Sequence, residues 1–323
     1  MANDTLRLRV ERITPEAEDI LSYELVAAEG GPLPSFEAGS HLDVHVPGGF
    51  LRQYSLCNDP EETHRYVITV QRDPQGRGGS RAMHEDVHPG AVLTTSLPRN
   101  NFPLLYARGY VLIAGGIGIT PLLSMARVLQ RQGAKWHLHY CTRSPERTAF
   151  RALLSSPELA GHVTVHHDGG DPARCLDVKA LLATRLAGHR LYCCGPAGLM
   201  RAVREAAIHH QWPREKVHFE AFSAAGTNAV SDMADTEFQV VVRSTGATLP
   251  VPPGRTVLNV LRDSGLPVPS DCEAGTCGTC LTGVLEGEPD HRDTFLSEPQ
   301  RVACRNMLVC VSRARSRKLV LDL

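Results

Sequence analysis

Four of the ten cysteines in this 323-residue chain are spaced in a way that few folds accommodate. Cys272, Cys277 and Cys280 form a C-x4-C-x2-C motif, and Cys310 follows further along the chain. This spacing is typical of a plant-type [2Fe–2S] cluster, in which one tight loop supplies three of the four thiolates. A structural zinc site also takes four cysteines, but zinc ribbons usually pair two C-x2-C knuckles. We therefore favour the cluster.

Cys304 is the alternative fourth ligand, because it lies shortly before Cys310. Gly275 and Gly278 belong to the loop of small residues between the first three cysteines, and small residues let backbone N–H groups point at the sulfides. The other cysteines are scattered and predict no disulfide framework, since a reducing compartment keeps thiols reduced. They are Cys57, Cys141, Cys175, Cys193 and Cys194.

The pattern of apolar residues changes twice along the chain and predicts three domains. Apolar and polar residues alternate between glycine-containing turns over 1–105, which indicates a small antiparallel β barrel. Continuous apolar strands, such as 110–114, then alternate with helices over 106–226, which indicates a parallel α/β sheet. A small and polar linker at 223–235 precedes a hairpin, a short helix and the cysteine motif, so an α+β domain is expected over 235–323.

A glycine turn follows the first strand of the α/β region and opens a helix. Gly116 and Gly118 let the backbone approach a pyrophosphate, and the helix start supplies amides and the positive end of a dipole. Pro121 suits the first helical turn, where no N–H is needed. The motif lacks the third glycine of G-x-G-x-x-G, so tight packing is the alternative interpretation.

A second turn, Cys194-Gly195-Pro196, follows a later strand of the same region. Parallel strands end at one edge of a sheet, and open α/β sheets bind ligands at that edge. We therefore expect the two turns to lie together at a nucleotide site.

Two motifs in the barrel region are candidates for binding a phosphate. RQYS at 52–55 ends a strand and offers a cation, an aromatic ring and a hydroxyl. RGGS at 77–80 opens a helix, with Ser80 as the expected N-cap, and its amides can bind an anion. Taken separately, Arg52, Tyr54 and Ser55 are better explained as a surface arginine, a core tyrosine and a turn serine.

Taken together, nine motifs resemble the phthalate dioxygenase reductase family, a branch of the ferredoxin–NADP reductase-like flavoproteins. The resemblance covers essentially the whole chain and implies an N-terminal FMN barrel, a central NADH domain and a C-terminal β-grasp-like ferredoxin. The motifs are RQYSLCND (52–59), RGGS (77–80), SLPRNNFPL (96–104), AGGIGITPLLSMA (114–126), HHDGGDP (166–172), YCCGPAGLM (192–200), HFEAF (218–222), CEAGTCGTC (272–280) and CVSRARS (310–316).

The resemblance also implies roles for individual residues. Ser55 hydrogen-bonds near flavin N5, where hydride arrives, Thr120 lies close by, and Phe222 covers the nicotinamide face of the ring. Asp168 accepts hydrogen bonds from the adenosine ribose. The implied FMN contacts are Arg52, Gln53, Tyr54, Ser55, Val70, Gln71, Arg77, Gly78, Gly79, Ser80, Thr120 and Phe222. The implied NADH contacts are Gly116, Gly118, Thr120, Pro121, Asp168, Cys194, Gly195 and Pro196. The implied cluster ligands are Cys272, Cys277, Cys280 and Cys310.

One position departs from the family pattern. Gln71 stands in the barrel strand where relatives often carry lysine, which weakens the case for a cation near the flavin. The binding site as a whole does not depend on that position.

These cofactors together predict an NADH-dependent reductase that passes electrons singly to a Rieske-type aromatic-ring oxygenase. Two alternatives are a reductase for another acceptor, such as a quinone or a different monooxygenase, and a zinc-stabilised nucleotide-binding regulator without catalysis. We expect a monomer that docks transiently on its protein acceptor.

The charge balance and the distribution of apolar residues argue against nucleic-acid-binding and membrane proteins. The net charge of −1 argues against a nucleic-acid binder, which shows a basic surface. No apolar run is long enough to cross a membrane, and the first residues carry no signal-peptide pattern. We therefore expect a cytoplasmic protein.

Overall fold

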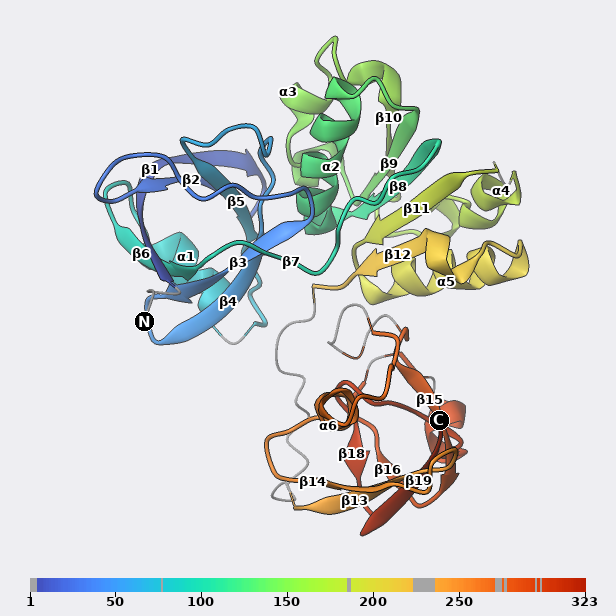
Figure 1. Cartoon of the computed structure of the whole chain (residues 1–323). Helices are drawn as coiled ribbons and strands as arrows, with labels where there is room; N and C mark the ends of the chain where they lie inside the picture. Colours follow the sequence, from blue (N-terminus) through green and yellow to red (C-terminus); the bar gives the residue numbers. More distant parts are fainter. Residues whose placement is uncertain are drawn as a thin grey trace. The chain divides into compact units, whose positions relative to one another are not determined.

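The computed structural model of the chain describes residues 5–76, 78–184, 187–222, 236–270, 275, 278–293, 295–296 and 298–323. Arg77, Cys272, Cys277 and the predicted linker at 223–235 lie outside the described residues. The chain divides into two compact units, Met1–Phe219 and Glu220–Leu323 (Figure 1). No helix in the described residues is long and apolar enough to cross a membrane.

The first part of the N-terminal unit is a nearly closed antiparallel barrel. Within the described residues its sheet has seven strands in the order β4-β3-β6-β1-β2-β5, with β7 paired to β3. Apolar residues alternate inward along the strands, and helix α1 (Gly79–Asp86) adds Met83 to the core. The strands are β1 (Thr5–Ala17), β2 (Ile20–Ala27), β3 (Ser40–Val46), β4 (Phe50–Ser55), β5 (Tyr66–Gln71), β6 (Val92–Ser96) and β7 (Arg99–Asn100).

The second part of this unit is an α/β sheet in the order β10-β9-β8-β11-β12. Strands β8 to β11 pair in parallel, as the alternation of strands and helices predicts. The strands are β8 (Gly109–Gly115), β9 (Trp136–Thr142), β10 (Val163–His167), β11 (His189–Cys194) and β12 (Val217–Glu220). The helices are α2 (Ile119–Arg131), α3 (Arg151–Leu154), α4 (Val178–Ala183), α5 (Ala197–His209) and the 3₁₀ turns η1 (Gly116–Gly118), η2 (Pro145–Arg147), η3 (Ala160–His162), η4 (Pro172–Arg174) and η5 (Arg214–Lys216).

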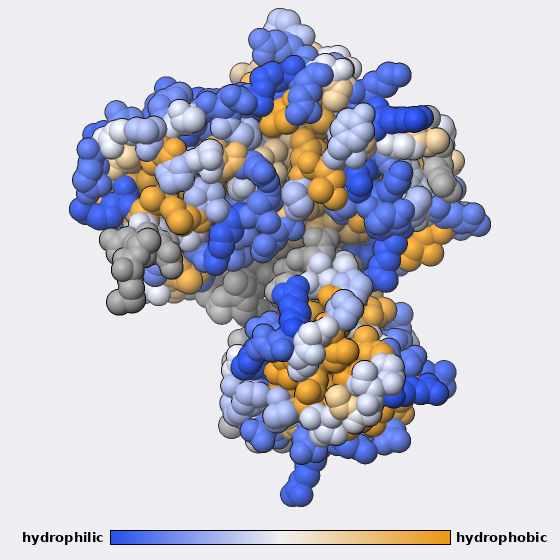
Figure 2. Space-filling model, viewed as in Figure 1, coloured by the Kyte–Doolittle hydropathy of each residue, from blue (hydrophilic) through white to orange (hydrophobic). Residues whose placement is uncertain are grey.

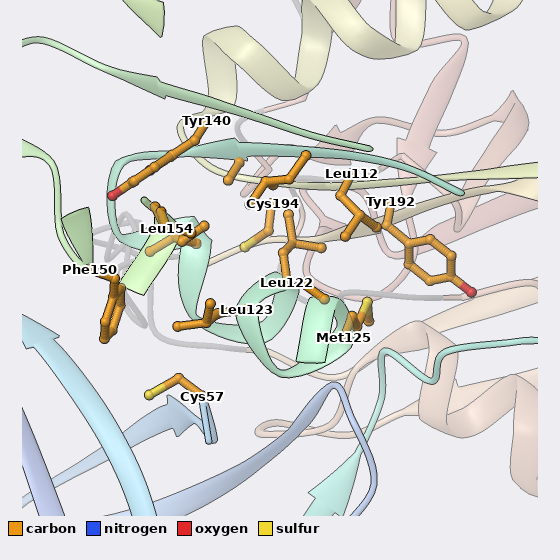
Figure 3. Packing of buried hydrophobic residues seen from close by; sticks show 14 of the residues in the cluster. Cys57, Leu112, Leu122, Leu123, Met125, Tyr140, Phe150, Leu154, Tyr192 and Cys194 are labelled. Atoms are coloured by element: carbon orange, nitrogen blue, oxygen red, sulfur yellow. The ribbon is translucent and has the colours of Figure 1, made fainter. Parts of the chain in front are cut away.

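The barrel and the α/β sheet share one hydrophobic cluster. Leu122 of α2 packs beneath the sheet beside Cys194, and Met125 extends the same cluster further along the helix (Figure 3). Cys57 of the barrel lies below Leu123 in this cluster. This shared core explains why residues 1–219 form one compact unit although the sequence pattern indicates two domains.

The C-terminal unit has a mixed sheet in the order β14-β13-β19-β15-β17. Strand β13 pairs antiparallel with β14 and parallel with β19, and the buried face of helix α6 covers the sheet, as in a β-grasp fold. The strands are β13 (Phe238–Val242), β14 (Thr248–Val251), β15 (Leu281–Glu286), β16 (Pro289–Asp290), β17 (Asn306–Leu308), β18 (Arg313–Ala314) and β19 (Lys318–Asp322), and the helices are α6 (Val257–Asp263) and α7 (Glu298–Val302). The fold class predicted from the sequence is confirmed.

Each of the two units has its own buried clusters of apolar residues. On the face seen in Figure 2, hydrophilic residues cover most of the surface, and hydrophobic residues gather in patches within each unit.

Candidate functional site

The start of helix α1 packs closely against the side chain of Arg52. Gly78 is the N-cap with φ of 95°, and no side chain among the described residues caps the helix there. A Cβ on Gly79 would lie 2.5 Å from Nε of Arg52, so only glycine lets this guanidinium pack against the helix start. A cation therefore stands beside uncapped amides, which is the arrangement that binds a terminal phosphate.

Arg52 is held in place by its own strand. Its guanidinium lies 5.1 Å from the centre of the Phe50 ring, and Nη1 donates to the Leu51 carbonyl at 2.8 Å. Arg52 pairs with no carboxylate among the described residues. The positive charge thus remains available to an anion.

The prediction that Ser80 caps helix α1 is wrong. The left-handed conformation of Gly78 starts the helix earlier, so Ser80 is the second helical residue. Its hydroxyl accepts the N–H of Asp73 at 3.1 Å and therefore ties the preceding loop to the helix. Its backbone amide stays in the first turn, where it can still face an anion.

Strand β4, which carries Arg52, also carries Tyr54 and Ser55. The Tyr54 hydroxyl is buried and has no hydrogen-bond partner among the described residues. Burial raises the pKa of Tyr54 to about 12, despite the opposing effect of Arg52, so the hydroxyl is a proton donor. An unsatisfied buried donor is costly, and a polar ligand would satisfy it. Ser55 is buried.

His41 is a polar residue at this site that the sequence analysis missed. It lies opposite Ser55 in the β3–β4 register, and its Nε2 is buried without a partner among the described residues. Burial, with a smaller contribution from the Arg99 charge, lowers the pKa of His41 to about 4, so the ring is neutral. The sequence carries no signal for this role, because His41 occupies a polar position of the alternating pattern over 41–46.

The other predicted flavin contacts of the barrel lie on the neighbouring strands. Val70 is buried in the barrel core, whereas Gln71, at the end of β5, and Gln53 are exposed. Strand β5 contacts the turn Gly116–Gly118 of the α/β sheet. The barrel site and the nucleotide edge are therefore neighbours within one compact unit.

The two glycine turns meet at the carboxyl edge of the parallel sheet, as predicted. A Cβ on Gly118 would lie 2.3 Å from the carbonyl oxygen of Cys194, and one on Gly195 would lie 2.9 Å from the backbone of Gly115. These glycines allow close packing of backbone against backbone. Gly116 differs, because it has φ of 53° and open space around it. Among the glycines of these two turns, only Gly116 leaves the backbone open to a ligand, as the sequence predicted.

Most of the remaining side chains of the two turns are buried or already hydrogen-bonded within the protein. Thr120 is buried and its hydroxyl donates to the Ile117 carbonyl at 3.1 Å, while Pro121 is buried in the first turn of α2. The Cys194 side chain is buried in the core (Figure 3), whereas Pro196 is exposed at the N-cap of α5.

Asp168 follows strand β10 at the same edge of the sheet. Its Oδ1 accepts the Gly170 N–H at 2.7 Å, and the thiol of the exposed Cys175 lies 3.7 Å from Oδ2. Burial and then the Asp168 charge raise the pKa of Cys175, so that residue is a neutral thiol. The proximity of Cys175 to Asp168 was not predicted from the sequence. The predicted partner on the nicotinamide side, Phe222, is 39% exposed and belongs to the C-terminal unit.

Cys280 and Cys310 lie on adjacent backbone segments of the C-terminal unit. Both side chains are buried, and the Val309 N–H donates to the Cys280 carbonyl at 3.5 Å. Cys304 has φ of 49°, and its thiol donates instead to the Arg301 carbonyl at 3.2 Å. No group of three metal-binding side chains occurs within the described residues, which do not include Cys272 and Cys277.

Comparison with known proteins identifies two domains of the chain. Residues 112–205 match the oxidoreductase NAD-binding domain, and residues 240–315 match the 2Fe-2S iron-sulfur cluster binding domain. The chain is 47% identical to phthalate dioxygenase reductase of Burkholderia cepacia over 98% of this chain and 97% of that protein. The chain belongs to the phthalate dioxygenase reductase family.

Members of the phthalate dioxygenase reductase family differ in the reactions that their names describe. A solved structure of phthalate dioxygenase reductase, described as a modular structure for electron transfer from pyridine nucleotides to [2Fe–2S], has a TM-score of 0.70 and covers 99% of this chain and 98% of its own. A tetrachlorobenzoquinone reductase of Sphingobium chlorophenolicum is 42% identical over 99% of this chain and 98% of that protein. The family, the oxidoreductase class and the NAD and [2Fe–2S] domains predicted from the sequence are confirmed.

Proposed function

We propose that this protein takes hydride from NADH onto FMN and passes the electrons singly through a [2Fe–2S] cluster to a Rieske-type oxygenase. One observation carries the proposal: an NAD-binding domain and a [2Fe–2S] domain occur on one chain that aligns end to end with phthalate dioxygenase reductase. When bound, a flavin accepts two electrons as hydride and releases them one at a time, which no side chain does. The chain's own residues bind and orient the cofactors.

FMN is the flavin that the barrel fits best. The guanidinium of Arg52 and the amides of Gly78, Gly79 and Ser80 together match one terminal phosphate. Tyr54 would donate a hydrogen bond to the bound flavin from its buried hydroxyl, and Ser55 and Thr120 are the residues that would contact the reacting part of the ring. Mass spectrometry of the flavin released from the purified protein tests this point, and FAD would contradict it.

The dinucleotide binds at the carboxyl edge of the parallel sheet. Gly116 leaves the backbone open there, and Asp168, already fixed by the Gly170 N–H, accepts hydrogen bonds from the ribose. Gly195 and Pro196, in the turn after β11, line the same edge of the sheet. We assign the FMN barrel to 1–105, the NADH domain to 106–226 and the ferredoxin to 235–323.

The cluster uses Cys272, Cys277, Cys280 and Cys310. The burial of Cys280 and Cys310 on adjacent segments, and the hydrogen bond of the Cys304 thiol to Arg301, support this choice. Cys304→Ser should keep the visible absorption of the cluster and a ratio of two irons per chain, whereas Cys310→Ser should lose both. The reverse result would make Cys304 the ligand, and zinc in place of iron in the unaltered protein would reject the cluster.

A quinone is the second candidate acceptor, because one relative is a tetrachlorobenzoquinone reductase. We favour a Rieske-type oxygenase, served by a monomeric cytoplasmic reductase, because phthalate dioxygenase reductase itself is the more similar relative. NADH consumption with a panel of oxygenases and with quinones separates the two. Turnover with quinone alone would replace the proposed partner.

A further inference from the structure

A short segment after strand β16 contacts the loop that carries the cluster cysteines. We name it the buttress segment; its described residues are His291, Arg292, Asp293, Phe295 and Leu296. Gly275 has φ of 71°, and a Cβ there would lie 3.1 Å from Cα of Asp293. A Cβ on Gly278, which stands between Cys277 and Cys280, would lie 2.5 Å from the Phe295 ring. The two described glycines of the cysteine loop, Gly275 and Gly278, therefore lie directly against this segment.

The buttress segment also binds the chain beside Cys310. Ser312 is fully buried, and its hydroxyl donates to Oδ1 of Asp293 at 3.3 Å. The same hydroxyl accepts the N–H of Arg292 at 3.3 Å. One segment thus connects the loop of three cysteines to the separate segment that holds the fourth.

Asp293 is the centre of these contacts. Its Oδ2 accepts the N–H of Phe295 at 3.1 Å and that of Leu296 at 2.7 Å, and its side chain is fully buried. Arg301 donates to the Asp293 carbonyl and places its charge 4.0 Å from Oδ2. Burial acts to raise the pKa of Asp293, but the His291 ring, the Leu296 N–H and the Arg301 charge outweigh it and hold the pKa below its usual range.

We propose that Asp293 is a positioning residue for the [2Fe–2S] cluster: its buried carboxylate locks the buttress segment against both cysteine-bearing segments and places a fixed negative charge behind the cluster loop. This inference rests on the proposed cluster ligands. Groups that orient metal ligands change metal affinity substantially when removed, and nearby charge is one of the factors that set the cluster's potential. Asp293 should therefore affect both how long the cluster is retained and how easily it is reduced.

Three variants of the full-length protein test the role. Asp293→Asn keeps the size of the side chain and removes its charge, while Ser312→Ala removes only the hydroxyl that joins the two segments. Asp290→Asn is the matched control. Asp290 also carries a buried carboxylate and pairs with Arg292 of the buttress segment at 2.8 Å and with Arg315 at 3.8 Å, but among the described residues it makes no hydrogen bond to Ser312 and no contact with Gly275. The measurements are the rate of iron release into a chelator and the midpoint potential of the cluster.

Asp293→Asn should release iron at least about tenfold faster than the unaltered protein and shift the midpoint potential to more positive values. Ser312→Ala should release iron faster without the shift in potential, and Asp290→Asn should match the unaltered protein in release. If Asp293→Asn assembles no cluster, Ser312→Ala decides the question through its release rate. Equal release from all four proteins, or equally fast release from Asp290→Asn, would overturn the inference alone. An unaltered protein without a [2Fe–2S] spectrum would overturn the proposed function as well.

Discussion

Gly79 and Gly118 each stand where a strand or loop turns into a helix, yet the structure needs glycine at the two positions for different reasons. At Gly79 the missing Cβ makes room for the end of a flexible side chain, the Arg52 guanidinium. At Gly118 it makes room for the fixed backbone of Cys194. The first turn is therefore built around a charge, and the second around packing. Substitution should therefore lower the stability of the fold at Gly118 and the affinity for the flavin at Gly79, although the two glycine turns look alike in the sequence.

The largest effect is expected for Gly118→Ala. The new methyl group meets a backbone carbonyl that cannot rotate away, so the free energy of unfolding should fall by at least about 2 kcal/mol. Gly198→Ala is the control, because Gly198 is exposed inside α5 with nothing near its Cβ position, and alanine there should be neutral or slightly stabilising. Chemical denaturation of both variants measures the difference. Equal stability of the two variants would remove the distinction drawn between the two turns.

Gly79→Ala should affect the flavin rather than the fold. The guanidinium can swing aside and alanine favours the helix, so stability should change by less than about 1 kcal/mol. The lost charge-assisted contact should weaken FMN binding by about 10- to 100-fold, and Arg52→Ala should do the same. Flavin fluorescence titration of the apoprotein measures this affinity.

Arg72→Ala is the matched control for Arg52, because Arg72 already pairs with Glu85 at 2.7 Å. It should leave FMN affinity unchanged. An equal loss in Arg72→Ala would mean that the barrel attracts FMN by its general charge and not through the helix start.

At the nucleotide edge, the choice between NADH and NADPH should depend on the charge of Asp168 and not on the glycines. Asp168→Ala should reduce the preference for NADH over NADPH by about tenfold, because the carboxylate no longer repels a 2′-phosphate. Asp171→Ala, a neighbour whose carboxylate accepts the Ala173 N–H at 2.9 Å, should keep the preference. The ratio of kcat/KM for the two nucleotides decides, and an unchanged ratio in Asp168→Ala would reject its assignment to the ribose.

The sequence predicted the fold class and the location of both glycine turns because strand and helix periodicities and turn residues are local signals. It did not reveal which neighbour each glycine accommodates, since Arg52 against Gly79 and Cys194 against Gly118 are contacts between distant segments. For the same reason it misplaced Ser80 as a cap and missed His41 and Cys175. Asp293 had no signal at all, because its role depends on contacts with Gly275 and Ser312 across the C-terminal unit.

The smallest effect should come from the hydroxyl of Tyr54, and its sign should depend on the flavin. Without FMN, Tyr54→Phe removes a buried donor that has no partner among the described residues, so the apoprotein should become more stable by up to about 1 kcal/mol. With FMN the same change removes a hydrogen bond, so affinity should fall a few-fold. Tyr66→Phe is the control, because the Tyr66 hydroxyl donates to the Pro34 carbonyl, and its loss should destabilise the apoprotein by about 1 kcal/mol. Denaturation curves with and without FMN give both signs. If Tyr54→Phe destabilises the apoprotein as Tyr66→Phe does, the hydroxyl already has a partner within the protein, and it no longer belongs with Arg52 among the groups held ready for the flavin.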